Sequence, residues 1–406
     1  MAELPAEIVP QLEWLRSRQS AMVELVLELC NLNSGTLNVE GIARVKDVLC
    51  REYKALGGDL KCLDVPPLER INDAGQVEKA LLGQAIVITK RPELRPRLLL
   101  CIHMDTVYDL DHPFQQCQFL DSGRLNGPGV ADAKGGLVVM LNALLAFEQS
   151  PLAERVGWQV IINPDEELGS PGSCDLLHDA AVAADWGLLF EPTLPDGTLV
   201  SWRKGSGNFT FVVRGKAVHA GRDFTAGRNA VVALSRLMTE IHALNTDPEI
   251  TYNVGRVSGG GALNIVPDLA IGRVNVRVRT TAQQELVERE FRRLVDVANQ
   301  ADGIRVELEG SFTSPPKTLD QRTESLQRLI EQCGGSLGIP IKWQGSGGAS
   351  DGNKFAAAGL PNIDSLGPMG GEIHSSREYL LVDSLVPRTQ LVTAVLAQLA
   401  LHAASR

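Results

Sequence analysis

Residues 158–170 read Trp-Gln-Val-Ile-Ile-Asn-Pro-Asp-Glu-Glu-Leu-Gly-Ser and join an apolar strand to two adjacent carboxylates. The apolar half, 158–162, has the composition of a strand buried in the middle of a sheet. A charged side chain next to such a buried strand costs free energy unless it is paired or binds a metal ion. One carboxylate of the pair Glu166 and Glu167 can bind a metal ion while its neighbour transfers protons as a general base. The stretch therefore predicts a central sheet with chemistry at its edge.

The segments on either side alternate between helix and strand. Apolar spacing typical of helices spans 11–60, and continuous apolar runs typical of buried strands follow. Further strands are expected at 85–88, 98–102 and 186–190, and helices at 135–147 and 174–181. Alternating helices and fully apolar strands predict an α/β sandwich. The alternation resumes near the end of the chain, through 326–337, 339–343 and 354–358, and closes with a helix at 382–401.

The pattern changes between these two parts of the chain. Strands and helices are expected there in the order β-α-β-β-α-β, at 208–214, 229–244, 250–257, 270–279, 283–300 and 303–309. Pro315-Pro316 marks the exit from this module. The sequence therefore predicts one α/β domain made of residues 1–202 and 312–406, interrupted by an inserted domain at 203–311.

Composition excludes several classes of protein. The chain has 406 residues, 44% hydrophobic and 22% charged, which is typical of a soluble globular protein. The formal charge of −10 argues against a nucleic-acid partner. No run approaches 18 apolar residues and no signal peptide is recognised, so no membrane span is expected. Seven scattered cysteines without a Cys-x-x-Cys pair are consistent with reduced thiols, and a cytoplasmic protein is expected.

Four further candidate metal ligands lie at strand ends or in tight loops, and the set is His103, Asp132, Glu191 and His374. Singly, each has an ordinary explanation, such as a hydrogen-bonded surface histidine or an N-cap aspartate. Together with Glu167 they form a set of two histidines and three carboxylates. Because ligands gather at the carboxyl ends of strands in open α/β sheets, this set fits a pair of cations with open positions for water. Asp105, two residues after His103, is placed to hold the second imidazole nitrogen.

The ordered motifs resemble the di-zinc family of glutamate carboxypeptidase, acetylornithine deacetylase, succinyl-diaminopimelate desuccinylase and aminoacylase. The motifs are His-Met-Asp-Thr-Val, Gly-Val-Ala-Asp-Ala-Lys-Gly-Gly, Asp-Glu-Glu-Leu-Gly-Ser, Phe-Glu-Pro-Thr, Gly-Lys-Ala-Val-His-Ala-Gly, Asn-Ile-Val-Pro and Ile-His-Ser. The C-terminal pattern is most similar to the glutamate carboxypeptidase branch. The resemblance implies a mixed-sheet α/β/α catalytic domain with an inserted α+β lid/dimerisation domain.

The resemblance also implies a role for each candidate. Asp132 would bridge two cations; His103 and Glu191 would complete one site, and Glu167 and His374 the other. Glu166 would be the general base and Asp105 would orient His103. Zinc is expected, with manganese or cobalt as alternatives. A cis peptide at Asp132–Ala133 is also implied.

The inserted module carries three further candidates. By the resemblance, His219 would support the oxyanion of a partner subunit's active site in a homodimer. Asn264 and Arg277 would hold the substrate's carboxylate, a task for which the guanidinium fork is suited. Read alone, His219 could be a solvated loop histidine and Arg277 an exposed strand arginine.

The leading hypothesis is a metal-dependent hydrolase that cleaves the amide bond of a C-terminal or N-acylated amino acid in a small or short-peptide substrate with a free carboxylate. An N-acyl amino acid deacetylase or aminoacylase is the alternative within enzymes. A non-catalytic binding protein on the same fold is the alternative outside them, and the complete set of base and ligands argues against it. The glycine-rich run around Asp132 matches neither a dinucleotide fingerprint nor a P-loop.

Overall fold

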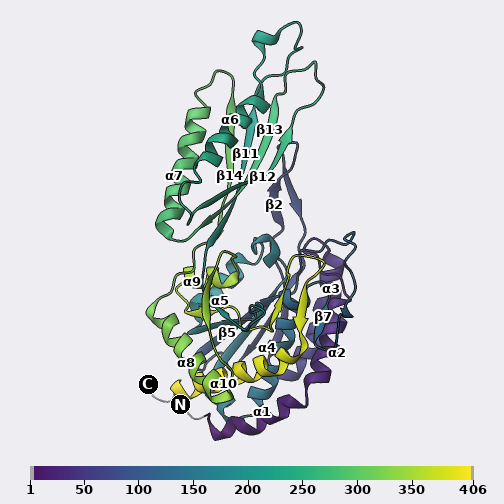
Figure 1. Cartoon of the computed structure of the whole chain (residues 1–406), viewed down its shortest axis with the longest axis vertical. Coiled ribbons are helices and arrows are strands. Elements are labelled where there is room, and N and C mark those ends of the chain that lie inside the picture. Colours follow the sequence, from purple (N-terminus) through teal and green to yellow (C-terminus); the bar gives the residue numbers. More distant parts are fainter. Residues whose placement is uncertain (1–3, 404–406) are drawn as a thin grey trace.

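A six-stranded sheet forms the centre of the larger domain in the computed structural model, which describes residues 4–403 (Figure 1). Its strands, in spatial order, are β1 (Asp59–Asp64), β4 (Gln84–Lys90), β8 (Gly157–Asn163), β5 (Arg97–His103), β9 (Trp186–Leu189) and β16 (Asn362–Ile363). β4 is antiparallel to both neighbours, whereas β8, β5, β9 and β16 are mutually parallel. The sheet is therefore mixed, as predicted, and the carboxyl ends of its parallel strands meet at one edge.

Helices cover both faces because the strands are apolar on both faces. Leu98 and Leu100 of β5 point into one core and Leu99 and Cys101 into the other, as the two-residue period of a strand requires. The first face is covered by α1 (Val9–Arg16), α2 (Gln19–Cys30), α3 (Val39–Tyr53), α4 (Gly136–Glu148), α8 (Gln321–Leu337) and α10 (Leu385–Ala403). The second face is covered by α5 (Cys174–Ala183) and α9 (Asp351–Ala357). This confirms the α/β/α prediction.

Two helical stretches, Val130–Glu148 and Val382–His402, are long and apolar enough to cross a membrane by length and composition. The sequence-based search for long apolar runs did not single them out. Within the protein, 94% and 78% of these stretches are buried, so their apolar side chains already form part of the core.

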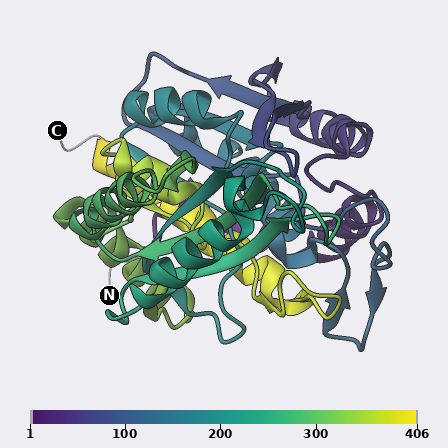
Figure 2. The same cartoon turned by 90° about the horizontal axis from the view of Figure 1, so that it is seen from above.

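The smaller part of the molecule, here called the lid module, has its own core. Its elements are β11 (Gly205–Arg214), α6 (Ala230–Ala243), β12 (Thr251–Gly259), β13 (Leu269–Val278), α7 (Thr281–Ala298) and β14 (Arg305–Ser314). The order is the predicted β-α-β-β-α-β, and the antiparallel sheet runs β12-β13-β11-β14. Seen from above, the module overlies part of the larger domain (Figure 2). The domain boundaries at 203 and 311 stay a prediction.

A buried ion cluster lies where the chain enters and leaves the lid module. Arg203 and Lys317 are paired through their backbones, each donating its N–H to the other's carbonyl at 3.1 Å. The carboxylate of Asp364 lies 2.9 Å from Arg203 Nε and 2.8 Å from Lys317 Nζ, and its side chain is fully buried. The Asp364 carboxylate therefore forms ion pairs with both segments that connect the lid module to the larger domain.

The helical prediction for 11–60 is wrong at its end, and one hairpin was not predicted. Residues 59–64 form the edge strand β1, and the hairpin β2 (Leu68–Ile71) and β3 (Val77–Ala80) follows. These strands are rich in charge and lack the apolar signal of a buried strand. The hairpin extends toward the lid sheet (Figure 1), where Asp73 pairs with Arg256 and lies 2.8 Å from Arg273. The hairpin is therefore held in place by contacts with residues of the lid module that lie far from it in the sequence.

A small second sheet brings two loops of the larger domain together. Its strands, in spatial order, are β17 (Gly370–Gly371), β18 (Tyr379–Leu381), β7 (Arg124–Asn126) and β6 (Gln118–Phe119). β18 is antiparallel to β7, with Tyr379 opposite Asn126. The loop before β18 therefore lies beside the loop after β7.

Candidate active site

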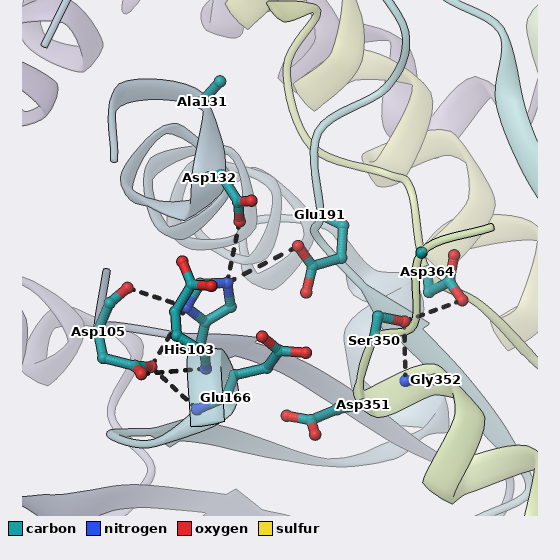
Figure 3. Close-up of polar contacts among 12 residues, drawn as sticks. His103, Asp105, Ala131, Asp132, Glu166, Glu191, Ser350, Asp351, Gly352 and Asp364 are labelled. Carbon is teal, nitrogen blue, oxygen red and sulfur yellow. Dashed lines mark hydrogen bonds and ion pairs between the residues drawn. The ribbon is translucent and has the colours of Figure 1, made fainter. Parts of the chain in front are cut away.

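His103 ends the central strand β5, and its imidazole is held from two sides (Figure 3). Nδ1 lies 3.0 Å from the backbone oxygen of Asp105 and 3.3 Å from its Oδ1. Nε2 lies 3.1 Å from Asp132 Oδ1 and 3.7 Å from Glu191 Oε2. Because Asp105 occupies the Nδ1 side, Nε2 is the nitrogen that faces the carboxylates.

Asp105 also organises the loop with the two glutamates. Its Oδ1 accepts the backbone N–H of Glu166 and its Oδ2 that of Glu167, each at 3.1 Å. The hydroxyl of Thr36 donates to Oδ2 at 2.7 Å, and the Asp105 side chain is fully buried. Sequence reasoning missed Thr36, which lies 69 positions before Asp105 and belongs to none of the motifs.

Asp132 faces two different histidines with its two oxygens. Oδ1 lies 3.1 Å from His103 Nε2, and Oδ2 lies 3.2 Å from His374 Nε2. Asp132 sits in the turn Val130–Gly135 between β7 and α4, and its peptide bond to Ala133 is cis, as the resemblance implied. The carboxylate therefore has the orientation that a ligand shared by two cations needs.

Two groups of side chains could each hold a cation, and they share Asp132. The first is buried and contains His103, Asp132 and Glu191, and the second contains Asp132, Glu167 and His374. In each group the ligand atoms lie within 4.8 Å of one another. Glu167 Oε2 lies 3.4 Å from His374 Nε2, whereas the buried Glu167 Oε1 has no hydrogen-bond partner. An unpartnered buried carboxylate oxygen and this donor set both fit a pair of divalent ions.

The pKa values of the candidate ligands reflect a cluster of negative charge. Burial, reinforced by the charge of Asp132, raises the pKa of Glu167 to about 7. Burial also raises the pKa of Glu191. Burial alone would lower the pKa of His103, but the surrounding carboxylates outweigh it and raise that pKa well above its ordinary value. Protons are thus favoured where cations would otherwise offset the clustered negative charge.

Glu166 lies beside the first group without belonging to it (Figure 3). Desolvation raises its pKa well above the ordinary value, and the negative charges of Glu191, Asp351 and Glu167 add to this rise while His103 opposes it. Its backbone is fixed by Asp105, as described above. A carboxyl group held next to a cation site, outside the set of ligands, has the placement of a proton-transfer group.

Asp351, in the run Gly-Gly-Ala-Ser-Asp-Gly-Asn at 347–353, is another residue whose role sequence reasoning did not assign. Its Oδ1 accepts from Lys354 Nζ at 2.9 Å and Ser170 Oγ at 2.5 Å, and its Oδ2 accepts from Asn163 Nδ2 at 2.8 Å. These contacts anchor the far end of the loop that carries Glu166. A buried Asp–Lys pair three residues apart in the first turn of a helix carries no sequence signal of its own.

The three candidates of the lid module lie at two opposite ends of it, with Arg277 apart from His219 and Asn264. Arg277 lies near the end of β13, opposite Ser206 at the start of β11, and its Nε donates to Asn275 Oδ1 at 3.0 Å. Desolvation lowers the pKa of Arg277, and the charge of Glu166 opposes this. Its position opposite Ser206 places Arg277 at the end of the module where β11 enters from the larger domain. His219 and Asn264 lie beyond the opposite end of the module.

His219 and Asn264 are adjacent and exposed. The backbone N–H of Ala220 donates to Asn264 O at 2.8 Å, and His219 is bridged to Ile265. The ten residues of β11 separate them from the larger domain by about 30 Å at the usual rise per residue. Within residues 4–403, no recorded contact joins His219 to a candidate metal ligand.

The comparisons agree with the resemblance seen in the motifs. The model of peptidase family M20/M25/M40 matches residues 99–398. Carboxypeptidase G2 of Pseudomonas sp. (strain RS-16) is 30% identical over 390 residues, which cover 93% of this chain and 88% of that protein. Succinyl-diaminopimelate desuccinylase of Methylococcus capsulatus is 26% identical over 371 residues, 86% of this chain and 96% of that protein. The crystal structure of the Bacillus subtilis YXEP protein, described as a dinuclear metal binding peptidase, has a TM-score of 0.63 at 16% identity and covers 94% of this chain and 98% of that chain.

Proposed function

This chain belongs to peptidase family M20/M25/M40, and we propose that it hydrolyses the amide bond of a C-terminal or N-acylated amino acid with two divalent cations. The family and its relatives make the protein a metal-dependent amide hydrolase. The observation that supports a two-cation site best is the orientation of Asp132, whose oxygens face His103 and His374 separately. Zinc is the cation proposed, because two histidines and three carboxylates suit it, although manganese and cobalt accept the same ligands.

The chain's own residues supply orientation and proton transfer. Cations bound in the two groups would supply the positive charge that activates a water and stabilises negative charge on the substrate carbonyl. The Glu166 carboxylate takes a proton from the attacking water and delivers it to the leaving amine nitrogen, so the carboxylate is restored at the end of the reaction. Asp105 keeps the imidazole of His103 turned toward the first group throughout.

The lid module completes the site in this proposal. Arg277, at the end of the module nearest the larger domain, holds the substrate's free carboxylate, with Asn275 keeping its guanidinium in place. His219 and Asn264 serve the site of a partner subunit in a homodimer. The support is their exposure at the far end of a strand of about 30 Å, which keeps them away from their own chain's cation groups.

The decisive experiment compares Glu166→Gln with the unaltered protein. Metal-stripped samples are loaded with zinc, manganese or cobalt and assayed against N-acyl amino acids and dipeptides for release of free amine. Glu166→Gln is expected to bind the same number of ions and to lose about 10²–10⁴-fold in turnover. Glu13→Gln, an exposed change on α1, is the matched control and should behave as the unaltered protein. Near-normal turnover of loaded Glu166→Gln would refute the assignment of the base.

The same screen separates the alternatives. Preference for substrates with a free C-terminal amino acid supports the carboxypeptidase-like reading, and preference for short acyl groups supports a deacetylase. Absence of turnover with every metal and substrate, despite two bound ions, would favour a binding protein.

Whether His219 acts in the active site of a partner subunit is tested by mixing two variant proteins. His219→Ala and Glu166→Gln proteins, each inactive alone, are combined under conditions of verified subunit exchange. Recovery of activity is expected, because a mixed dimer pairs one intact Glu166 with the partner's intact His219. No recovery would argue that His219 serves its own chain or has no catalytic part.

A further inference from the structure

Glu378 is a fully buried carboxylate that none of the roles above includes. It comes four residues after His374, at the end of the loop between β17 and β18. Its Oε1 accepts the backbone N–H of Ala131 at 2.9 Å and of Asp132 at 3.0 Å. Its Oε2 accepts the backbone N–H of Gly129 at 3.2 Å. One side chain from the His374 loop therefore binds the backbone of the Asp132 turn three times.

The turn needs this acceptor because its first backbone N–H groups lack helical partners. The amides of Gly129, Ala131 and Asp132 stand at the start of the turn, where N–H groups have no acceptor in a preceding helical turn. A carboxylate that accepts several backbone amides forms stronger bonds than a neutral acceptor would. Glu378 thus fixes the backbone from which Asp132 projects.

The same carboxylate is tied to the segment after β5. The hydroxyl of Tyr108 donates to Glu378 Oε2 at 2.7 Å and to the backbone oxygen of Ser375 at 2.9 Å. Asn126 Nδ2 donates to the backbone oxygen of Glu378 at 2.7 Å. Three segments that carry candidate ligands, one after β5, one after β7 and one before β18, therefore meet at Glu378.

We propose that Glu378 is a positioning residue that sets the spacing between the two cation sites by coupling the His374 loop to the Asp132 turn. The inference rests on the proposed function, because it presupposes two bound ions. The two sites differ in how much they depend on this coupling. His103 is buried and anchored by β5 and Asp105, whereas the side chain of His374 is 51% exposed and lies in the loop that Glu378 ends. Loss of Glu378 should therefore weaken the ion at His374 first.

The test variant is Glu378→Gln, which keeps the shape of the side chain but replaces one acceptor oxygen with an amide donor. That donor would face the Gly129 N–H or the amides of residues 131 and 132, so at least one bond must be lost. Glu372→Gln is the matched control. It removes a carboxylate from the same loop, but Glu372 is exposed and pairs with Arg377 at 2.8 Å. Tyr108→Phe is a second, milder variant, because it deletes the hydroxyl contacts to Glu378 and to the Ser375 carbonyl and leaves the three amides in place.

Stripped proteins are titrated with Co²⁺, and the number of bound ions and the visible cobalt absorption are recorded. For Glu378→Gln we expect the ion at His374 to lose about 10–100-fold in affinity while the ion at His103 is little changed. Tyr108→Phe should shift the same ion by less, and Glu372→Gln should match the unaltered protein. If Glu378→Gln does not fold, Tyr108→Phe decides the matter by the same criterion.

Unchanged affinity for both ions in the folded variants, or an equal loss for both, would overturn the inference. These outcomes are separate from a failure of the proposed function. That failure would show as an unaltered protein that does not bind two ions, or that binds them and hydrolyses no amide.

Discussion

Replacing Asp105 with asparagine should weaken the cation at His103 without unfolding the protein. The carboxylate accepts three donors, the Thr36 hydroxyl at 2.7 Å and the N–H groups of Glu166 and Glu167 at 3.1 Å. Asparagine has one acceptor oxygen. If this oxygen accepts from Thr36 and Glu167, the amide nitrogen of the asparagine faces the Glu166 N–H and His103. The nitrogen is a donor, so the hydrogen bond from the Glu166 N–H is lost.

The expected magnitude follows from that lost bond. A hydrogen bond to a charged group contributes about 1.5–3 kcal/mol, and about 1.4 kcal/mol corresponds to a factor of ten. Affinity for the ion at His103 should therefore fall about 10–100-fold, which is also the usual effect of altering a residue that orients a metal ligand. Hydrolysis at limiting metal should fall in parallel and recover when metal is added in excess.

The assay is competitive titration of stripped protein with zinc against a chelator of known affinity, followed by turnover at each free-metal concentration. Asp121→Asn is the control, because Asp121 also accepts two backbone amides, from Gly123 at 2.9 Å and Arg124 at 2.8 Å, but is exposed and outside the site. Wild-type affinity for both ions in Asp105→Asn would refute the reasoning.

Three other predictions concern stability. Burial raises the pKa of Glu167 and of Glu378 from 4.5 to about 7, so both bind protons more tightly when folded, and the metal-free protein should lose stability as pH rises from 4.5 to about 7. Scans of the melting temperature across this range should show the fall, and bound cations, which favour the charged forms, should remove it; a metal-free protein that gains stability over this range would contradict the assignment. Phe291→Ala should destabilise the lid module by about 3–5 kcal/mol in denaturant titration, because the fully buried ring lies edge-on to Phe209 with centroids 5.0 Å apart; a loss below about 1 kcal/mol would mean that the module's core repacks. Asp364→Asn should cost about 3–5 kcal/mol in the same assay, because it leaves two buried cations without their anion.

The positions of His103 and Glu191 after apolar strands could be predicted from the chain alone, whereas their assignment with Asp132 to one cation group came from the family resemblance. His103 and Glu191 follow apolar strands, and the sheet places β5 and β9 side by side and parallel. Carboxyl ends of adjacent parallel strands must meet, so residue type and position after a strand carried the information. The predicted order of elements in the lid module was correct for a similar reason, because alternation and amphipathic spacing are local properties.

Charged edge elements were missed because nothing local distinguishes them from loops. Each strand of the hairpin at 68–80 has two adjacent charged residues at its centre and no run of apolar residues. At its tip, Asp73 pairs with arginines about 180 to 200 positions later in the chain. Such contacts depend on how two modules are placed relative to each other. The helical prediction that ran through residue 60 was wrong at β1 for the same reason, because this edge strand is stabilised by its hydrogen bonds to β4.

Local sequence thus determined the two-part fold, the order of its elements along the chain in outline, and the residue types of the two cation groups, because periodicity and strand-end positions act over a few residues. Tertiary structure alone decided which way each carboxylate turns. That Asp132 faces two histidines, that Thr36 reaches Asp105, and that Glu378 binds the Asp132 turn all depend on loops that approach only after the sheets have formed. Hydrogen bonds form over about 3 Å, so these pairings become defined only once packing has fixed the backbones that carry them.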